Sequence, residues 1–494
     1  MNKPTDNEAL SAGPDAAATT GTGAALERIM PALEAFTTFR DPDRTVTQRS
    51  SWLPIFDVPL PDRGVGLDSM LGELSIAVEQ GCRVAHPGFS GFITNGAMTA
   101  GVASATAVAV AGGQRYLLHA FNALESIGLD WLASLCGLGE TEGVFCSGGS
   151  VANLLALGAA RQWTLEQRGV DPAQDGLPTG AQYRIYASTE AHRTIHRSAA
   201  VLGLGRNSVR EIATDDHQRL DVHELETALK EDRKRGIVPI AVVGIAGTTN
   251  TGAIDPLEDL LEVGRRFGSW VHVDGAYGLP AAVDPEVEPK VRAVAEADSA
   301  IVDPHKWLAT GIGVAATFVR QPGILQRAFA EGEAAYIDTS FATDSTAVTQ
   351  FDSMGVNWAD MGVELSAPPR GVHVWAVLRE IGRDGFRDRV RRHRQFAQHV
   401  TRRAERHPRL EALTSPELSI ACLRYRPNTQ RDDLDALTDR ILGRLRRETD
   451  FVPTATIVNG ALAIRPCFIN PRTTPSEVDG LVDALVRIGD DETR

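Results

Sequence analysis

Short apolar runs alternate with longer amphipathic stretches across residues 91–369, and this alternation limits what the chain can fold into. The apolar runs include 183–187, 237–246, 270–273 and 300–302, and stretches of helical periodicity such as 257–267 and 291–297 lie between them. Strands that alternate with helices form βαβ units around a mostly parallel sheet. Ligands of such sheets bind beyond the carboxyl ends of the strands. We therefore expect an α/β domain with its binding site at that edge.

The segments on either side of this domain differ from it in character. Residues 1–24 are small and polar without periodicity, which predicts a disordered tail, and residues 25–90 combine helical patterns with proline-containing linkers, which predicts an N-terminal helical arm. The large domain is expected over 91–370. Residues 371–494 are expected to form a small α+β domain. Its predicted elements are a long arginine-rich helix at 374–406, strands at 418–425 and 461–468, and a final helix at 475–488.

Composition argues against several classes of protein. The formal net charge of −14 at pH 7 disfavours broad nucleic-acid binding, which needs a basic face. The five cysteines are odd in number and show no CxxC spacing, which favours free thiols in the cytoplasm over disulfides or a zinc site. We find no pattern typical of a signal peptide. The apolar run 97–112 is too short and too weakly hydrophobic to span a membrane, so we expect a packed helix and no membrane partner.

Lys306 is one of only five lysines, and it follows a strand-like run in the sequence Asp303-Pro304-His305-Lys306-Trp307. A lysine held in a partly apolar pocket becomes a usable amine nucleophile for Schiff-base chemistry. Taken alone, Lys306 is better explained as an interfacial lysine with a packed stem and a hydrated head. Its interpretation therefore depends on the other motifs of the domain.

Two motifs lie before and after the strand predicted at 183–187. Gly148, Gly149 and Ser150 precede a helical stretch, and glycines before a helix let backbone N–H groups converge on an anion. His192 follows the strand and could lie flat over a planar ligand. A simple glycine-rich turn and a capping histidine are the alternatives. His192 and His196 have the spacing of a metal pair, but no third ligand stands at a convincing distance, so no metal is expected.

Two further motifs end the following strands. Thr249 lies in a hydroxyl-rich turn after the run at 237–246, and Asp274 ends the run at 270–273. A buried carboxylate is costly unless it is paired, and a cationic ring nitrogen would pair it. An anion loop, a flat histidine, a hydroxyl-rich turn, a strand-end aspartate and a strand-end lysine together suit one ligand, pyridoxal phosphate. The alternative for Asp274 is a cap of the next turn.

The combination resembles the group II pyridoxal-phosphate-dependent amino-acid decarboxylases, the family of the aromatic-amino-acid and glutamate decarboxylases. The resemblance runs from His86-Pro87-Gly88-Phe89 to Leu462-Ala463-Ile464-Arg465-Pro466, and its most specific motifs are Asp303-Pro304-His305-Lys306-Trp307 and Asp274-Gly275-Ala276-Tyr277. It implies an aminotransferase-like fold of type I with a mostly parallel seven-stranded sheet. It also implies a tight homodimer with active sites at the dimer interface.

The resemblance further implies roles for single residues. It assigns the covalent cofactor link to Lys306, the pyridinium partner to Asp274 and ring stacking to His192. The remaining cofactor contacts are expected from Gly149, Ser150, Thr249, Ala276, Asp303 and His305. Asp303 stands where relatives often carry asparagine, so a carboxylate would face the cofactor phosphate.

Other implied residues concern the substrate and a closing loop. Tyr336 falls where a catalytic tyrosine protonates the substrate's α-carbon, and an anchor for the loop is its alternative role. Arg370 would reach the cofactor or the substrate carboxylate, unless it serves the start of the next helix. The remaining residues expected at the substrate pocket are Phe92, Ile93, Asn95 and His119.

The expected reaction is decarboxylation of a hydrophobic or aromatic L-amino acid to the amine and carbon dioxide. Oxidative decarboxylation to an aldehyde is the closest alternative, followed by transamination or another lyase reaction on the same fold. A dinucleotide-binding protein is disfavoured because Gly203-Leu204-Gly205 lacks the third glycine of that fingerprint.

Overall fold

The computed structural model of the protein describes residues 22–38, 49–115, 119–330, 356–428 and 433–494. The chain forms two compact units, Met1–His86 and Pro87–Arg494. The first unit contains α2 (Thr22–Thr38), α3 (Arg49–Phe56) and α4 (Leu67–Glu79), and α4 packs against both other helices. Among its described residues, Ile29, Leu71 and Ala85 are the buried apolar side chains, and Arg28 pairs with Asp68. The domain boundaries expected at 24/25, 90/91 and 370/371 stay predictions.

The second unit is built on a seven-stranded sheet. Its strands are β2 (Glu142–Cys146), β3 (Tyr183–Ser188), β4 (Val209–Ile212), β5 (Val238–Ile245), β6 (Trp270–Asp274), β7 (Ser299–Val302) and β8 (Ala315–Val319), in the order β2-β8-β7-β6-β5-β3-β4. Neighbours from β4 to β7 pair in parallel, and β8 runs antiparallel to both β7 and β2. The predicted α/β class and mostly parallel sheet are confirmed. Asp274 at the end of β6 is in register with Ile245 and Ile301, so the three strands end together.

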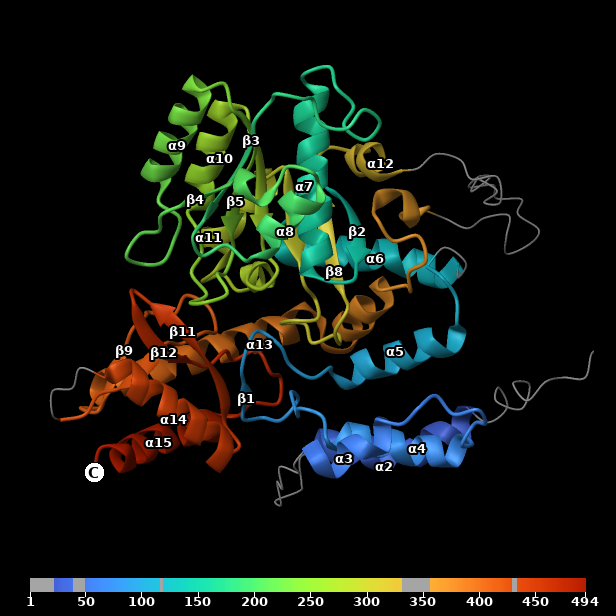
Figure 1. Cartoon of the computed structure of the whole chain (residues 1–494), viewed down its shortest axis with the longest axis vertical. Helices are drawn as coiled ribbons and strands as arrows, with labels where there is room; N and C mark the ends of the chain where they lie inside the picture. The colour runs from blue at the N-terminus through green and yellow to red at the C-terminus, as the bar shows by residue number, and fades with distance from the viewer. Residues whose placement is uncertain (1–21, 39–48, 116–118, 331–355, 429–432) are drawn as a thin grey trace, which may run out of the picture. The chain divides into compact units, whose positions relative to one another are not determined.

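Eight helices of the second unit precede its small domain in the described residues. They are α5 (Thr99–Ala111), α6 (His119–Cys136), α7 (Gly149–Glu166), α8 (Thr194–Val201), α9 (Val222–Lys234), α10 (Leu257–Phe267), α11 (Glu288–Val291) and α12 (Ile324–Phe329), with 3₁₀ turns at Arg206–Ser208, Leu279–Val283, Arg292–Glu296 and Trp358–Met361. Helix α7 contacts strands β5 to β8, and α10 contacts β5 and β6 (Figure 1). A side chain at Gly244 of β5 would overlap Leu257 and Leu260 of α10, so this position requires glycine.

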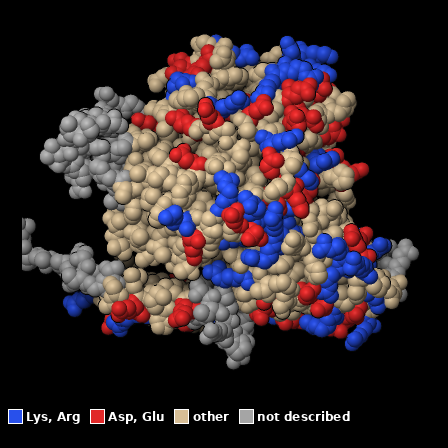
Figure 2. All heavy atoms as spheres, turned by 180° about the vertical axis from the view of Figure 1, so that it is seen from behind, with Lys and Arg blue, Asp and Glu red and all other residues tan. Residues whose placement is uncertain are grey.

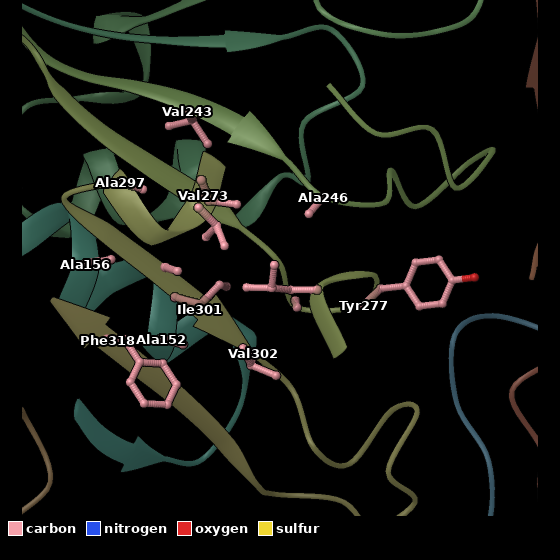
Figure 3. Packing of buried hydrophobic residues seen from close by; sticks show 14 of the residues in the cluster. Ala152, Ala156, Val243, Ala246, Val273, Tyr277, Ala297, Ile301, Val302 and Phe318 are labelled. Atoms are coloured by element: carbon pink, nitrogen blue, oxygen red, sulfur yellow. The ribbon is translucent and has the colours of Figure 1, made fainter. Parts of the chain in front are cut away.

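The core beneath the sheet is made of small and branched apolar side chains (Figure 3). Val243, Val273 and Ile301 come from three adjacent strands, and Ala152 and Ala156 bring α7 close to them. All five are at most 1% exposed. Such dense packing fixes the strand ends, and side chains placed there are therefore held on a rigid base.

A smaller domain follows the large one. Its sheet has the order β1-β11-β12-β10-β9, with β1 (Phe89–Ser90), β9 (Leu410–Ala412), β10 (Leu423–Tyr425), β11 (Val452–Val458) and β12 (Ala461–Arg465), and its helices are α13 (Gly371–Arg406), α14 (Leu434–Glu448) and α15 (Pro475–Glu492). Helix α13 carries a non-helical Gly382 with φ 66°. Residues from Val374 to Val390 belong to the large core, and residues from Phe396 to Ala404 belong to the second core.

Two predicted strands are too long. The strand expected at 418–425 is limited to Leu423–Tyr425, with only an isolated bridge from Ile420 to Cys467 before it. The strand expected at 461–468 ends at Arg465, because Pro466 has no N–H to continue a ladder.

The apolar run at 97–112 forms a helix, α5, that is mostly exposed. Only Gly101, Ser104 and Val108 of this helix are buried, whereas Val102 is 50% and Val110 is 64% exposed. In the part of the chain that the structure describes, no helix has both the length and the apolar character needed to cross a membrane. The face shown in Figure 2 carries acidic and basic side chains interspersed.

Candidate active site

A cavity of about 390 Å³ opens at the carboxyl ends of the parallel strands. Its walls come from the segments that follow β2, β3, β5, β6 and β7. The lining residues include all nine predicted cofactor contacts: Gly149, Ser150, His192, Thr249, Asp274, Ala276, Asp303, His305 and Lys306. The structure therefore brings together groups that are spread over more than 150 residues of sequence.

Lys306 reaches the cavity from the turn after β7. Its Nζ atom lies 3.0 Å from Oδ2 of Asp303, and its side chain is 22% exposed. The backbone of this turn is held from outside, because the Asn95 side-chain amide donates to the carbonyls of Lys306 at 2.6 Å and Ile469 at 2.9 Å. Asn95 thus supports the lysine's backbone and does not line the cavity.

Asp274 is 7% exposed at the end of β6. Its Oδ2 accepts a hydrogen bond from Nδ2 of Asn153 at 3.0 Å, and its Oδ1 accepts one from the backbone N–H of Ala276 at 3.2 Å. Both oxygens of this carboxylate thus accept a hydrogen bond. Such a carboxylate would suit a cationic ring nitrogen as its further partner.

His192 lies on the cavity wall after β3. Its Nδ1 accepts the backbone N–H of Thr194 at 3.3 Å and lies 2.9 Å from the Thr194 hydroxyl. Burial lowers the pKa of His192, which favours a neutral ring. Glu190, two residues earlier, also lines the cavity; burial raises its pKa, and Asn250 donates to its Oε2 at 2.9 Å.

Helix α7 begins at the cavity. Gly148 occupies its N-cap position and supplies no side-chain cap, so the first-turn N–H groups of Gly149 and Ser150 are left for a ligand. The helix dipole adds a partial positive charge at this end. A Cβ atom on Gly149 would lie 2.7 Å from Oδ2 of Asp303, so only glycine fits this close approach. The arrangement is a cradle for a phosphate-sized anion.

His305 faces inward beside the lysine. Its Nδ1 donates to the carbonyl of Val314 at 2.7 Å, which leaves Nε2 3.7 Å from Oδ2 of Asp303. Burial is the main cause that lowers the pKa of His305. A neutral imidazole with a fixed orientation is therefore present next to Lys306 and Asp303.

Three of the residues expected at the substrate, Phe92, Ile93 and Arg370, do not line this cavity. Phe92 is 67% exposed, and Ile93 packs on the large core. Arg370 is buried, and its guanidinium donates to Glu364 at 2.9 and 3.1 Å and to the carbonyl of Gly313 at 3.0 Å. Tyr336 and the side chain of His119 lie outside the described residues. Their substrate and catalytic roles stay predictions.

Sequence reasoning missed several residues that build the cavity. Asn153 follows Gly149 by four residues, a helical spacing that sets both on one side of α7 and could have identified it. Arg465 is 3% exposed and donates to the carbonyls of Phe92 at 2.7 Å, Thr249 at 2.5 Å and Asn250 at 3.1 Å. It thereby ties the Thr249 turn to the small domain, a contact that no local pattern predicts.

The cavity fits pyridoxal phosphate by the chemistry of its donor set. An amine, a supported carboxylate, a flat neutral histidine and a helix N-terminus match the aldehyde, ring nitrogen, ring face and phosphate of that molecule. Asp303 does not fit as a phosphate ligand, because its carboxylate already pairs with Lys306 and lies close to Gly149. The described residues also contain no group of three or more His, Cys, Asp and Glu side chains that could hold a metal ion.

Comparison with known proteins agrees with this donor set. Residues 51–426 match the model of the pyridoxal-dependent decarboxylase conserved domain. The aromatic-L-amino-acid decarboxylase of Bacillus atrophaeus is 30% identical over 72% of this chain and 70% of its own length. The phenylacetaldehyde synthase of Petunia hybrida is 28% identical over 72% of this chain and 71% of its own length. The crystal structure of Oryza sativa TDC with PLP and tryptamine superposes with a TM-score of 0.85 at 23% identity, over 98% of this chain and 99% of that one.

The fold and the cavity define an enzyme of the type I pyridoxal-phosphate class. Because the family model covers well over half of the sequence, the chain belongs to the pyridoxal-dependent decarboxylase family. It is a carboxy-lyase that decarboxylates an amino acid with pyridoxal phosphate as its cofactor. The family, reaction and cofactor predicted from the sequence are thereby confirmed.

Proposed function

We propose that the enzyme converts a hydrophobic or aromatic L-amino acid to its amine, with Lys306 as the covalent anchor of the cofactor. The observation that carries the proposal is the single cavity that holds the amine of Lys306, the carboxylate of Asp274 and the N-terminus of α7. When bound, pyridoxal phosphate supplies an electron sink for the electron pair left as carbon dioxide departs. Asp274 stabilises positive charge on the ring nitrogen and thereby strengthens that sink.

The remaining residues hold the cofactor in place and move protons. The backbone N–H groups of Gly149 and Ser150 bind the phosphate, and His192 covers one face of the ring. Ala276 is small enough to let the ring approach the backbone, and Thr249 contacts the ring substituents. Tyr336 donates the proton that the substrate's α-carbon needs after carbon dioxide has left, and Lys306 then moves a proton at Nζ as the amine is released. Tyr336 lies outside the described residues, and its role follows the family resemblance; the other roles follow the residue types and the lining of the cavity.

The test is product analysis with purified enzyme and added pyridoxal phosphate. We expect equal amounts of amine and carbon dioxide from at least one hydrophobic or aromatic amino acid. The Lys306→Ala variant should lose both the visible colour of the bound cofactor and turnover, whereas Lys290→Ala, at an exposed ion pair with Glu417, should keep both. Absence of carbon dioxide release from every standard amino acid would overturn the proposal.

Aldehyde formation is the second candidate, favoured by the likeness to the Petunia phenylacetaldehyde synthase. In that reaction oxygen oxidises the substrate, and the products are an aldehyde, ammonia, carbon dioxide and hydrogen peroxide. Peroxide and ammonia in amounts equal to carbon dioxide would identify it. The Tyr336→Phe variant should shift the products from amine toward aldehyde if the tyrosine supplies the proton.

The preference for an apolar substrate is supported by the cavity wall. Ile245, Tyr277 and Ile312 line it, and Ile312 is 84% exposed at the rim. A screen of amino acids by the spectral shift of the bound cofactor tests this preference. Saturation with phenylalanine, tryptophan, tyrosine or leucine at concentrations well below those needed for glutamate is the expected result.

We further propose a cytoplasmic homodimer with the cavities near its interface. Val102 and Val110 of α5 present exposed apolar surface, Ile312 does so at the cavity, and a second copy would cover them. The five cysteines are free, as expected in a reducing compartment. Light scattering should give twice the mass of the chain, and Val110→Glu should lower that mass and the activity together.

A further inference from the structure

Asn153 lies on the first turns of α7 and is 2% exposed. Its amide has a partner at each end. Oδ1 lies 2.9 Å from Nε2 of His272, and Nδ2 lies 3.0 Å from Oδ2 of Asp274 and 3.1 Å from Oγ1 of Thr194. One buried side chain thus makes hydrogen bonds to His272 on β6, to the cavity carboxylate of Asp274 and to Thr194, the residue that contacts His192.

The direction of each hydrogen bond follows from groups that can act in only one way. The Asp274 carboxylate only accepts, so Asn153 must present its NH₂ group there and its carbonyl to His272. The Nε2 atom of His272 therefore carries a proton. Because His272 is neutral in this buried position, its Nδ1 accepts from the Ser299 hydroxyl at 2.9 Å, and Ser299 accepts from the indole of Trp270 at 2.8 Å.

The same reasoning reaches His192 on the other side. The backbone N–H of Thr194 can only donate, so Nδ1 of His192 carries no proton. The Thr194 hydroxyl accepts from Asn153 and donates to the same Nδ1. A neutral His192 therefore holds its proton on Nε2. From the indole of Trp270 to Nδ1 of His192, each donor in this series of hydrogen bonds meets an acceptor.

We propose that Asn153 is a positioning residue that orients the Asp274 carboxylate and, by donating to the Thr194 hydroxyl, directs that hydroxyl toward Nδ1 of His192, whose tautomer the Thr194 backbone N–H already favours. The proposal rests on the proposed function, in which Asp274 pairs with the cofactor ring and His192 covers it. Without the amide, Oδ2 of Asp274 loses its donor, and the carboxylate can turn about its own side-chain bond. The Nε2–H of His272 is also left buried with no acceptor, which favours rearrangement of the network.

The decisive measurement on the unaltered protein is the nitrogen chemical shifts of histidines in the apo-enzyme labelled with ¹⁵N-histidine. His192 and His272, assigned by single substitutions, should both show a protonated Nε2 and a bare Nδ1. A proton on Nδ1 of His272 and none on Nε2 would place the NH₂ group of Asn153 toward His272 and away from Asp274, which would overturn the proposal, and this result needs no variant of Asn153 to fold.

Variants then measure what the residue contributes. Asn153→Asp keeps the acceptor for His272 and removes both donors, and Asn153→Ala removes all three bonds. Both should lower kcat by roughly 20-fold or more with the amino-acid KM changed by less than about threefold, the pattern of a lost transition-state interaction. Gln162→Ala is the matched control, because Gln162 is a buried amide on the same helix whose Nε2 donates to Glu166 and Asp171. It should leave kcat within about twofold.

A binding cycle separates this proposal from the proposed function. Asn153→Ala should raise the dissociation constant of pyridoxal phosphate by about tenfold in the otherwise unaltered enzyme, but by less than about twofold when Asp274 is already asparagine. If Asp274→Asn itself changes neither affinity nor turnover, the proposed function fails. If Asp274→Asn is impaired and Asn153→Ala acts equally in both backgrounds, the proposed function stands and the positioning role of Asn153 is wrong.

Discussion

The Nζ atom of Lys306 lies 3.0 Å from Oδ2 of Asp303, three residues earlier in the chain. The same oxygen would lie 2.7 Å from a Cβ atom on Gly149, at the start of α7. Within the described part of the chain, Oδ1 of Asp303 is buried and has no hydrogen-bond partner. The Asp303 carboxylate therefore lies between the amine of Lys306 and the N-terminus of α7, so its charge acts on both.

Asp303→Asn should strengthen cofactor binding. The substitution removes a like charge beside the phosphate cradle and frees Lys306 from an ion pair that must break when the cofactor binds. We expect the dissociation constant of pyridoxal phosphate to fall about tenfold, or roughly 1.4 kcal/mol. Titration of the apo-enzyme followed by tryptophan fluorescence measures it. A weaker affinity would mean that the carboxylate helps to hold the cofactor.

Gly149→Ala should weaken cofactor binding. The added methyl group would overlap the Asp303 carboxylate, and the first turn of α7 would have to move away from it. We expect the dissociation constant of pyridoxal phosphate to rise by about tenfold or more. The loss should be smaller in the Asp303→Ala background, where the overlap is absent. An equal loss in both backgrounds would assign the effect to the helix turn itself.

Arg465→Lys should damage both affinity and stability. A lysine cannot reproduce the planar set of donors that now serves the carbonyls of Phe92, Thr249 and Asn250. Each carbonyl left without its donor costs about 1 kcal/mol, so the free energy of unfolding should fall by about 2–3 kcal/mol. The cofactor dissociation constant should rise about fivefold, because the Thr249 turn loosens.

Arg472→Lys serves as the control for this variant. Arg472 donates to the carbonyls of Gly96 and Ala97, which do not line the cavity. We expect it to lower the urea midpoint of unfolding without changing cofactor affinity. A change of affinity equal to that of Arg465→Lys would show that the effect is general.

Stability should fall as the pH falls from about 6.5 to about 4. Burial, followed by the charge of Arg370, lowers the pKa of His373 from 6.5 to about 4. Between these values the unfolded chain binds a proton that the folded chain does not, so the folded state loses on the order of 2–3 kcal/mol by pH 4. Urea unfolding of His373→Gln should show a weaker dependence on pH over this window. The same dependence in both proteins would exclude His373 as its source.

Much of the large domain could be predicted because its signals are local. The strands expected at 183–187 and 270–273 differ from β3 and β6 by one residue at one end, since apolar runs between turns are decided by nearby sequence. The exposure of α5 could not be predicted. Its composition is apolar on all sides, and nothing in the helix itself says which side lacks a partner.

The cavity was predicted where its groups follow strand ends and was missed where contacts are distant. Asn153 and Asp274 lie 121 positions apart, and no spacing rule connects them. Arg370 was expected either to reach the cofactor or substrate carboxylate or to serve the start of the next helix; it is the N-cap residue of α13, and its guanidinium pairs with Glu364, six residues before it. The direction in which a side chain such as that of Arg370 points depends on its partners, and the short sequence around it does not identify them.

Helix α13 links the two cores, because its first half packs with the large domain and its second half with the small one. Loss of order in either half removes packing from the other, so melting should be a shared, cooperative event. The positive φ of Gly382 lies within the first half, not at the junction, which leaves the junction itself continuous helix. Removal of the chain from this helix onward would expose to solvent the core residues of the large domain that α13 now covers. The large and small domains are therefore distinct in their sheets and cores, but we expect them to unfold together as one cooperative unit.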